Sequence, residues 1–223
     1  MPIDLSKLKV VAIHSIPRYG TNSHWGCVHD VLAPFGIVSW RGMGAFWHMQ
    51  LSDLFDHAIN EGVDWVLTID HDSMFSQAHL GRLMTRFAES SLDAVAAVEA
   101  RRGVKEVLGG ATGRCLYGPH YQLLDTAHFG LTLLKVKNLA RVPRPWFDFR
   151  PDPQGNWREG RTDADIWFWQ QWKKAGNTVA LDLAVTIGHL EELVSTVDQY
   201  GNKRFQTVQE WHEENRNLNA GKI

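Results

Sequence analysis

The sequence contains few cysteines, little net charge and no long apolar run. Its 223 residues include only two cysteines, Cys27 and Cys115, which are too few for a disulfide framework or a cysteine-based zinc site. A formal net charge of −2, from 23 basic and 25 acidic side chains, excludes a global positive field that would attract nucleic acid. The apolar run near the N-terminus is too short for a signal peptide or a membrane span. We therefore expect a cytoplasmic protein with a single domain over residues 1–223.

Two kinds of apolar pattern alternate along the chain. β-Branched runs predict strands at 7–16, 37–40, 63–69, 92–100, 131–136 and 177–185. Helical spacing predicts helices at 45–60 and at 77–91, the second beginning after the N-cap Ser76. In the first of these helices, the residues expected near one face are Phe46, Met49, Leu54 and Ala58. Because strands alternate with helices, the pattern predicts a three-layer α/β/α fold with a mainly parallel central sheet.

A pair of aspartates ends one of these strands. The stretch VDWVLTIDHDSMF, residues 63–75, is largely apolar until Asp70, His71 and Asp72. In α/β sheets, ligands bind beyond the carboxyl ends of the strands, where these side chains lie. Two carboxylates this close repel each other and lose hydration, which a divalent cation would offset. The same spacing also occurs in turns that cap a following helix. We interpret His71 as structural, because in a continuing strand it would point away from both aspartates.

Two later segments carry polar residues at matching places. The stretch EGRTDADIWFWQQWKKAG, residues 159–176, has acidic side chains at the start of an aromatic-rich helix that ends at Gly176. The stretch LDLAVTIGHLEE, residues 181–192, is a predicted strand that runs out onto Gly188 and His189. Both segments therefore supply polar groups where the sheet is expected to hold a ligand.

With these three segments, the sequence resembles the GT-A glycosyltransferases, which transfer a sugar from a nucleotide diphosphate to an acceptor. The resemblance extends from Lys9 to about His189 and includes FGLTLLKVKNLARV, residues 129–142, which is similar to the strand before the acceptor loop of that family. It implies a Rossmann-like nucleotide-diphospho-sugar transferase fold with three parts: a nucleotide-binding half at 1–100, an acceptor half at 101–189 and a C-terminal tail, a candidate lid, at 190–223.

The resemblance also assigns roles around a cation. It implies Asp72 as the direct carboxylate ligand, His189 as the second ligand, and Asp70 as a contact to the ribose or to a metal-bound water. Hard oxygen ligands suit Mg²⁺, and an imidazole favours Mn²⁺, so the expected cofactor is Mn²⁺ or Mg²⁺. Such a cation would stabilise the leaving diphosphate as a Lewis acid. The implied enzyme is hexosyltransferase-like and uses a nucleotide-sugar donor, with a UDP-sugar as the first choice. Its acceptor is a glycan, a lipid-linked sugar, a protein, a metabolite or a modified nucleic-acid base.

A catalytic base is expected at the start of the aromatic helix. The usual Glu-Asp pair of the family appears here as Ala164-Asp165, preceded by Asp163. An inverting transferase needs a carboxylate that takes the acceptor proton, and the resemblance implies Asp165, with Asp163 as the alternative. A retaining enzyme would not need this base. The letters TDAD also match a capping box with Thr162 as N-cap and Asp165 reaching back from N3.

Contacts to the nucleotide and to the acceptor are expected from position along the chain. Arg18 and Tyr19 come just after the first predicted strand, where the nucleotide base would bind, and Arg41 follows the second strand. Trp146 and Phe147 lie before a long polar loop and form a candidate stacking platform for the acceptor.

Two other classes of protein share part of this pattern. A haloacid-dehalogenase-type phosphatase also has Asp-x-Asp at a strand end, but normally at its first strand, and it requires Thr or Val where Met74 stands here. A noncatalytic carbohydrate-binding protein would explain the ten tryptophans, but not the acidic and histidine residues at the strand ends.

Overall fold

The runs predicted as strands assemble into one eight-stranded sheet in the computed structural model, which describes residues 7–16, 21–100, 121–158 and 160–219. The strands of this sheet are β1 (Val10–Ile16), β2 (Val38–Met43), β3 (Trp65–Ile69), β4 (Ser73–Met74), β5 (Ala94–Glu99), β6 (Tyr121–Leu123), β7 (Leu131–Lys135) and β8 (Val179–His189). Their order is β2-β1-β3-β7-β5-β8-β4, and β6 pairs with β8 outside this path.

Most of the sheet is parallel. Strand β1 runs parallel to β2 and β3, and β5 runs parallel to β8. Strand β7 is antiparallel to both of its neighbours, β3 and β5, so these two neighbours point the same way. The carboxyl ends of β1, β2, β3, β5 and β8 therefore meet at one edge of the sheet, as the predicted fold requires.

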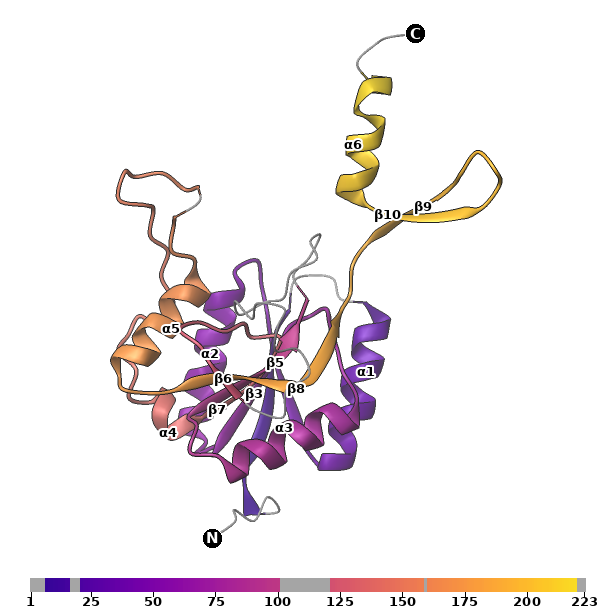
Figure 1. Ribbon diagram of the computed structural model, residues 1–223. Coiled ribbons are helices and arrows are strands. Elements are labelled where there is room, and N and C mark those ends of the chain that lie inside the picture. The colour runs from indigo at the N-terminus through magenta and orange to yellow at the C-terminus, as the bar shows by residue number, and fades with distance from the viewer. Residues whose placement is uncertain (1–6, 17–20, 101–120, 159, 220–223) are drawn as a thin grey trace.

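Helices cover both faces of the sheet, as Figure 1 shows. They are α1 (Asn22–Leu32), the 3-10 helix η2 (Ala33–Phe35), α2 (Trp47–Asn60), α3 (Gln77–Glu89), α4 (Val136–Leu139) and α5 (Ala164–Lys174). Strand β5 shows how the layers divide, because successive strand residues face opposite sides. Ala94, Ala96 and Val98 join the core formed with α2, α4 and α5, whereas Val95 and Ala97 join the core formed with α1 and α3. The α/β/α prediction is confirmed.

One predicted helix face is partly wrong. The buried residues of α2 are Leu51, Leu54, Phe55 and Ala58. Phe46 and Met49 are exposed, because the helix begins only at Trp47 and its inner face starts one turn later. The N-cap of α3 is Ser76, as predicted, and its hydroxyl accepts a hydrogen bond from the His79 amide.

The C-terminal part of the chain forms an arm. It consists of β9 (Leu193–Val197), β10 (Lys203–Thr207) and α6 (Val208–Asn219), and β9 and β10 pair as an antiparallel hairpin. Figure 1 shows this arm standing apart from the body, connected through β8. Helix α6 is joined to the hairpin by an ion pair between Arg204 and Glu214. Within the described residues, no helix is long and apolar enough to span a membrane.

Candidate active site

The Asp-x-Asp segment forms a tight turn at the carboxyl end of β3. Every residue of β3 is buried, and the strand ends at Ile69. The Asp70 amide then donates to the Gly130 carbonyl (3.2 Å), and the Ser73 amide donates to the Asp70 carbonyl (3.3 Å). After this turn the chain enters β4, which pairs with the far end of β8. The turn is therefore held between the 128–130 segment and β8.

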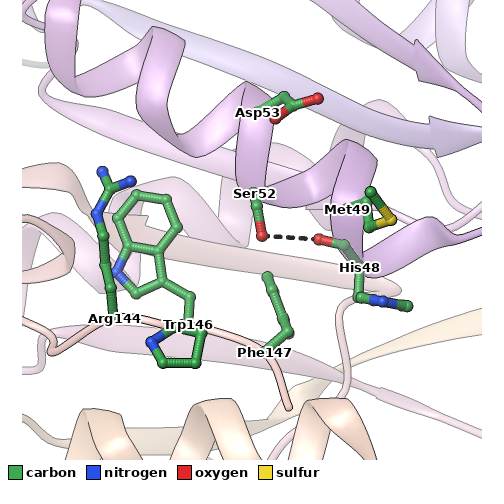
Figure 2. Close-up of a pocket in the computed structure, with 8 residues that line it drawn as sticks. His48, Met49, Ser52, Asp53, Arg144, Trp146 and Phe147 are labelled. Atoms are coloured by element: carbon green, nitrogen blue, oxygen red, sulfur yellow. Dashed lines mark hydrogen bonds between the residues drawn. The ribbon is translucent and has the colours of Figure 1, made fainter.

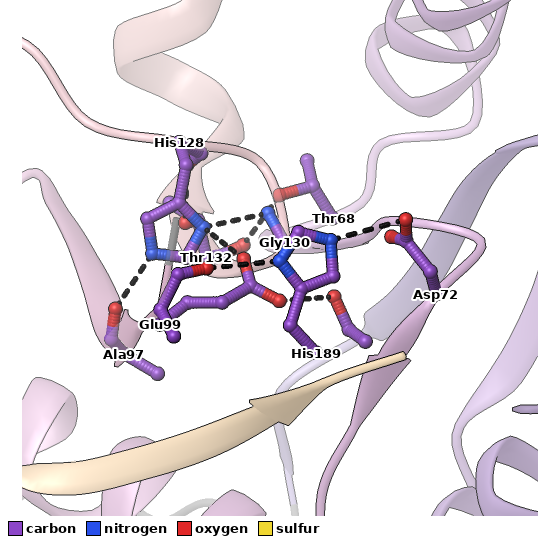
Figure 3. Close-up of polar contacts among 10 residues, drawn as sticks. Thr68, Asp72, Ala97, Glu99, His128, Gly130, Thr132 and His189 are labelled. Atoms are coloured by element: carbon purple, nitrogen blue, oxygen red, sulfur yellow. Dashed lines mark hydrogen bonds and ion pairs between the residues drawn. The ribbon is translucent and has the colours of Figure 1, made fainter. Parts of the chain in front are cut away.

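Strand pairing brings Asp72 and His189 together. In the antiparallel pairing of β4 with β8, Ser73 lies opposite His189, and the Leu190 amide donates to the Asp72 carbonyl (2.8 Å). As a result, Asp72 Oδ2 lies 3.1 Å from His189 Nε2, as Figure 3 shows. The Asp72 side chain is largely enclosed, since the residue is only 6% exposed. The two expected cation ligands thus lie side by side.

The other nitrogen of His189 sets the orientation of its ring. His189 Nδ1 lies 2.9 Å from the carbonyl oxygen of Ala100, which can only accept a hydrogen bond, so Nδ1 carries a proton. In the neutral ring, Nε2 then presents a lone pair toward the Asp72 carboxylate. This is the arrangement of a metal-binding histidine held by an outer hydrogen bond. Asp72 and His189 therefore fit a divalent cation as a pair, although the described residues contain no group of three His, Cys, Asp or Glu arranged for one.

The expected orientation of His71 is wrong. Its Nε2 lies 3.7 Å from Asp72 Oδ2, so its ring turns toward the same carboxylate as His189. The alternation argument fails because β3 has already ended at Ile69, and a turn does not alternate its side chains.

The two aspartates at the start of α5 have different surroundings. Asp163 forms an ion pair with Arg161 (Oδ1 to Nε, 2.7 Å). Asp165 is half-buried, and its pKa is raised, mainly by burial and further by the charge of Asp163, against lowering by the Ile166 amide and by His128. A raised carboxylate pKa is what a general base near neutral pH requires. Asp165 is therefore the better candidate for a base.

The alternative capping box is wrong. The N-cap of α5 is Asp163 rather than Thr162, and its side chain makes no capping hydrogen bond. Asp165 lies in the first turn of the helix, where its carboxylate accepts a hydrogen bond from the Ile166 amide (2.8 Å). Capping therefore does not account for Asp165.

A buried histidine pair lies on the side of α1. His14, on β1, and His24, on α1, are both fully buried, with their ring centroids 6.1 Å apart. The pKa of His14 is lowered to about 3, mainly by burial and further by the charges of His24 and Arg41. Arg41 lies within β2 rather than after it, opposite His14 in the β1–β2 pairing, because β2 continues to Met43. Its guanidinium stacks 4.9 Å from the ring centre of Trp25. Arg18 and Tyr19, the other two expected nucleotide contacts, lie outside the described residues.

The expected acceptor platform is not exposed. Trp146 and Phe147 are only 4% and 7% exposed and belong to the core beneath α2 and α5. The guanidinium of Arg144 also lies over the Trp146 ring, 4.3 Å from its centre. These two side chains help to line a surface pocket of about 610 Å³ beside α2 (Figure 2), but their low exposure leaves no open face for stacking. Their roles as core residues explain why they are aromatic.

Sequence reasoning missed two residues of the site, Glu99 and His128. Glu99 ends the buried strand β5, and His128 precedes β7, and their side chains lie 3.1 Å apart (Glu99 Oε2 to His128 Nδ1; Figure 3). The sequence signal that could have found Glu99 is its place as a lone acidic residue at the end of the apolar run 92–100. Nothing local in the sequence connects it to His128.

Comparisons with known proteins identify the architecture of the chain. No protein-family model and no curated protein sequence matches the chain. Among solved structures, A197 from STIV aligns with a TM-score of 0.59 at 13% identity, over 90% of this chain and 95% of that one. GalNAc-T7, solved with UDP, GalNAc and Mn²⁺, aligns with a TM-score of 0.54 at 9% identity, over 82% of this chain. The chain has the GT-A fold.

The comparisons differ in how much of each protein they cover. The chain spans 44% of the GalNAc-T7 chain, so that protein contains further parts that have no counterpart here. Another GT-A protein, glucosyl-3-phosphoglycerate synthase from Mycobacterium tuberculosis in complex with Mn²⁺ and UDP-glucose, aligns with a TM-score of 0.47 at 8% identity, over 91% of this chain and 88% of that one. Identities this low establish the architecture and leave activity to be argued from the site.

Proposed function

We propose that the protein is a metal-dependent glycosyltransferase that moves a sugar from a nucleotide-diphosphate sugar, with a UDP-sugar as the first choice, to an acceptor hydroxyl. The observation that carries this proposal is the meeting of Asp72 and His189 at the carboxyl edge of a GT-A sheet. GalNAc-T7, which shares the fold, is solved with UDP and Mn²⁺, and this supports the same class of donor here.

Asp72 and His189 would hold the cation. One carboxylate oxygen and one imidazole nitrogen are a donor pair that favours Mn²⁺, with Mg²⁺ as the alternative. When bound, the cation would supply Lewis-acid stabilisation of the leaving diphosphate. The enclosed Asp72 side chain and the hydrogen bond from His189 to Ala100 keep both ligands in place before the donor binds. Asp70, the first residue of the turn, would contact the ribose or a metal-bound water.

The nucleotide would lie beyond the carboxyl ends of β1 and β2. Arg41, near the carboxyl end of β2, is exposed and is held by its contact with Trp25, so its charge is available to a nucleotide. The assignments of Arg18 and Tyr19 to the nucleotide base stay predictions. On the other side of the sheet edge, Asp165 would accept the proton of the acceptor hydroxyl as that oxygen bonds to the sugar carbon and the bond to the diphosphate breaks.

The phosphatase alternative has less support. The aspartates follow β3, the third strand along the chain, and Asp72 Oδ2 lies 3.1 Å from His189 Nε2. A phosphatase of that class would also release phosphate from simple esters through an aspartyl intermediate.

A thermal-shift experiment tests the proposal. Mn²⁺ and UDP together are expected to raise the melting temperature of the wild-type protein more than either alone, because a ligand that binds only the folded state stabilises it. Asp72→Asn is expected to lose this joint effect. The matched control is Asp125→Asn, which removes an exposed carboxylate paired with Lys173 and should keep it. An Asp72→Asn protein that responds like wild type would contradict the assignment.

A transfer assay tests the base. Asp165→Asn is expected to bind Mn²⁺ and UDP normally while losing about 10²- to 10⁴-fold in turnover, the usual contribution of a general base. Turnover near the wild-type rate would instead indicate a retaining mechanism that does not use this carboxylate.

A further inference from the structure

A buried polar cluster lies directly behind the Asp70–Asp72 turn. At its centre is Glu99, which is only 1% exposed. Its Oε1 accepts a hydrogen bond from the Ser73 hydroxyl (3.0 Å), and its Oε2 lies 3.1 Å from His128 Nδ1. Figure 3 shows Glu99 and His128 side by side, close to Gly130. One carboxylate thus links two segments that are distant in sequence.

The partner of Glu99 is an imidazole with a defined orientation. His128 Nε2 lies 2.7 Å from the Ala97 carbonyl oxygen, which can only accept, so this nitrogen carries a proton. Burial by itself would lower the pKa of His128, but the hydrogen bond and charge of Glu99 outweigh it, with help from Ala97 and Asp70, so the pKa is raised. When protonated, the ring forms a buried ion pair with Glu99; when neutral, its Nδ1 can instead accept the hydrogen bond of the Gly130 amide (2.9 Å).

The cluster contacts the backbone of the turn through Gly130. A β-carbon at this position would overlap Glu99 Oε2, so only glycine allows the carboxylate to pack this closely. The Gly130 carbonyl accepts the hydrogen bond from the Asp70 amide (3.2 Å). Glu99 is thus linked to both ends of the turn. It bonds Ser73 directly, and it packs against Gly130, whose carbonyl binds the Asp70 amide.

Fold stability alone does not explain this pair. Burying two charges costs desolvation free energy, and well-packed apolar side chains in the same place are often as stable or more stable. The pair does, however, fix the orientation of Ser73. Ser73 is held at its hydroxyl by Glu99 and at its carbonyl by His24 Nδ1 (2.9 Å), so the residue after Asp72 cannot rotate freely.

We propose that Glu99, braced by His128, is a positioning residue that holds the Asp70–Ser73 turn and so directs the Asp72 carboxylate at His189. This rests on the proposed function, in which Asp72 and His189 bind the cation. Partners that hold a metal ligand in place commonly change metal affinity or activity by about 10- to 100-fold when removed. Glu99 would act in this way without touching the cation or the sugar.

Hydrogen exchange of the metal-free protein tests the positioning directly. Three variants are compared: Glu99→Ala, Glu99→Gln and Ser73→Ala. In the two alanine variants, the amides of Asp70 and Leu190 are expected to exchange about tenfold faster or more, the factor expected on losing a hydrogen bond to a charged group. Glu99→Gln should restore slow exchange, because its amide oxygen accepts from Ser73 and its amide nitrogen donates to His128 Nδ1.

Metal titration provides the functional readout. At saturating UDP-sugar, the Mn²⁺ concentration for half-maximal rate is expected to rise about 10- to 100-fold in Glu99→Ala and less in Ser73→Ala, with Glu99→Gln close to wild type. The matched control is Arg86→Gln, which breaks a partly buried ion pair between Arg86 on α3 and Asp182 on β8. This control should lose stability without changing the Mn²⁺ requirement.

The outcomes separate the two proposals. Unchanged exchange and an unchanged Mn²⁺ requirement in folded Ser73→Ala and Glu99→Ala would overturn the positioning role and leave the transferase proposal intact. If Glu99→Ala does not fold, Ser73→Ala decides, because it removes one of the two links from the turn to Glu99. A wild-type protein without any joint Mn²⁺ and UDP effect would overturn the transferase proposal, while the exchange measurement would still decide whether Glu99 positions the turn.

Discussion

The two sides of the Asp70–Ser73 turn carry buried histidines in opposite electrostatic situations. On the side of α1, His14 lies among His24 and Arg41, and its pKa is lowered to about 3. On the side of β7, His128 is just as enclosed, but it pairs with Glu99, and its pKa is raised. Burial is common to both, so the neighbouring charge decides whether the imidazole pKa is lowered or raised.

The two sides therefore make opposite contributions to stability as pH changes. A histidine whose folded pKa is lowered contributes stability above its unfolded pKa of about 6.5, which is lost as pH falls toward the folded value. A histidine whose folded pKa is raised contributes stability below about 6.5, which is lost as pH rises through the folded value. His14 is the first case and His128 the second.

The largest expected effect comes from removing one member of the ion pair. His128→Leu leaves the Glu99 charge buried with Ser73 as its remaining partner among the described residues, which should lower the free energy of unfolding by about 3–5 kcal/mol at pH 7. His14→Leu should instead be neutral or stabilising, because neither ring nitrogen of His14 has a hydrogen-bond partner within the part of the chain that the structure describes. Urea denaturation of both variants measures the difference. Equal destabilisation of the two variants would show that His14 and His128 do not differ in their electrostatic surroundings.

Acid titration of stability should give an effect of similar size. The pKa of His14 is about 6.5 in the unfolded chain and about 3 in the folded protein. As pH falls from 7 to 3, protonation of His14 in the unfolded chain should therefore lower the wild-type free energy of unfolding by on the order of 4 kcal/mol. His14→Leu lacks this loss, so its stability curve should fall less steeply than that of wild type. Parallel curves for the two proteins would show that His14 is not buried as a neutral ring.

A smaller effect is expected at Asp165, whose pKa also depends on burial and on a neighbouring charge. Burial, and then Asp163, raise the pKa of Asp165, so transfer should fail on the acid side at a higher pH than an ordinary aspartate would give. Asp163→Asn removes a negative neighbour and should move the acid limb of kcat/KM to lower pH. Asp125→Asn, a distant exposed carboxylate, should leave the limb unchanged. A limb that does not respond to Asp163→Asn would exclude Asp165 as the titrating group.

The smallest effect is expected at Arg41. Its guanidinium contacts Trp25 at the exposed edge of the histidine side, where such contacts contribute about 0.5–1 kcal/mol. Because Arg41 is exposed and solvent screens its charge, Arg41→Ala should weaken UDP binding by less than about tenfold, as measured by calorimetry. It should also slightly raise the pKa of His14, because one positive neighbour is removed. An increase in UDP affinity would show that Arg41 does not face the nucleotide.

The fold was largely predictable because its signals are local. The apolar β3 run and the i, i+3, i+4, i+7 pattern of α3 each follow from neighbouring residues, and both elements formed where the sequence indicates. The errors come from places where a local pattern stops. The spacing predicts Phe46 and Met49 near the same face of α2 as Leu54 and Ala58, but it does not show where the helix begins. Strand alternation predicts the wrong direction for His71, because β3 ends at Ile69.

The acceptor side shows a different limit. Trp146 and Phe147 have the composition of a stacking platform, but the same side chains also fill cores, and only packing against Phe55 and Phe168 shows that they are buried. Residue type cannot separate these roles, because the hydrophobic effect and sugar stacking both favour aromatic rings.

What the sequence by itself determined is the order of the elements and the presence of aspartates and a histidine at strand ends, because these depend on periodicity along a few neighbouring residues. The tertiary structure alone decided that Asp72 meets His189 and that Glu99 meets His128. These contacts join segments far apart in the chain, and the β4–β8 register and the packing of Gly130 against a carboxylate, which no local pattern encodes, set their distances.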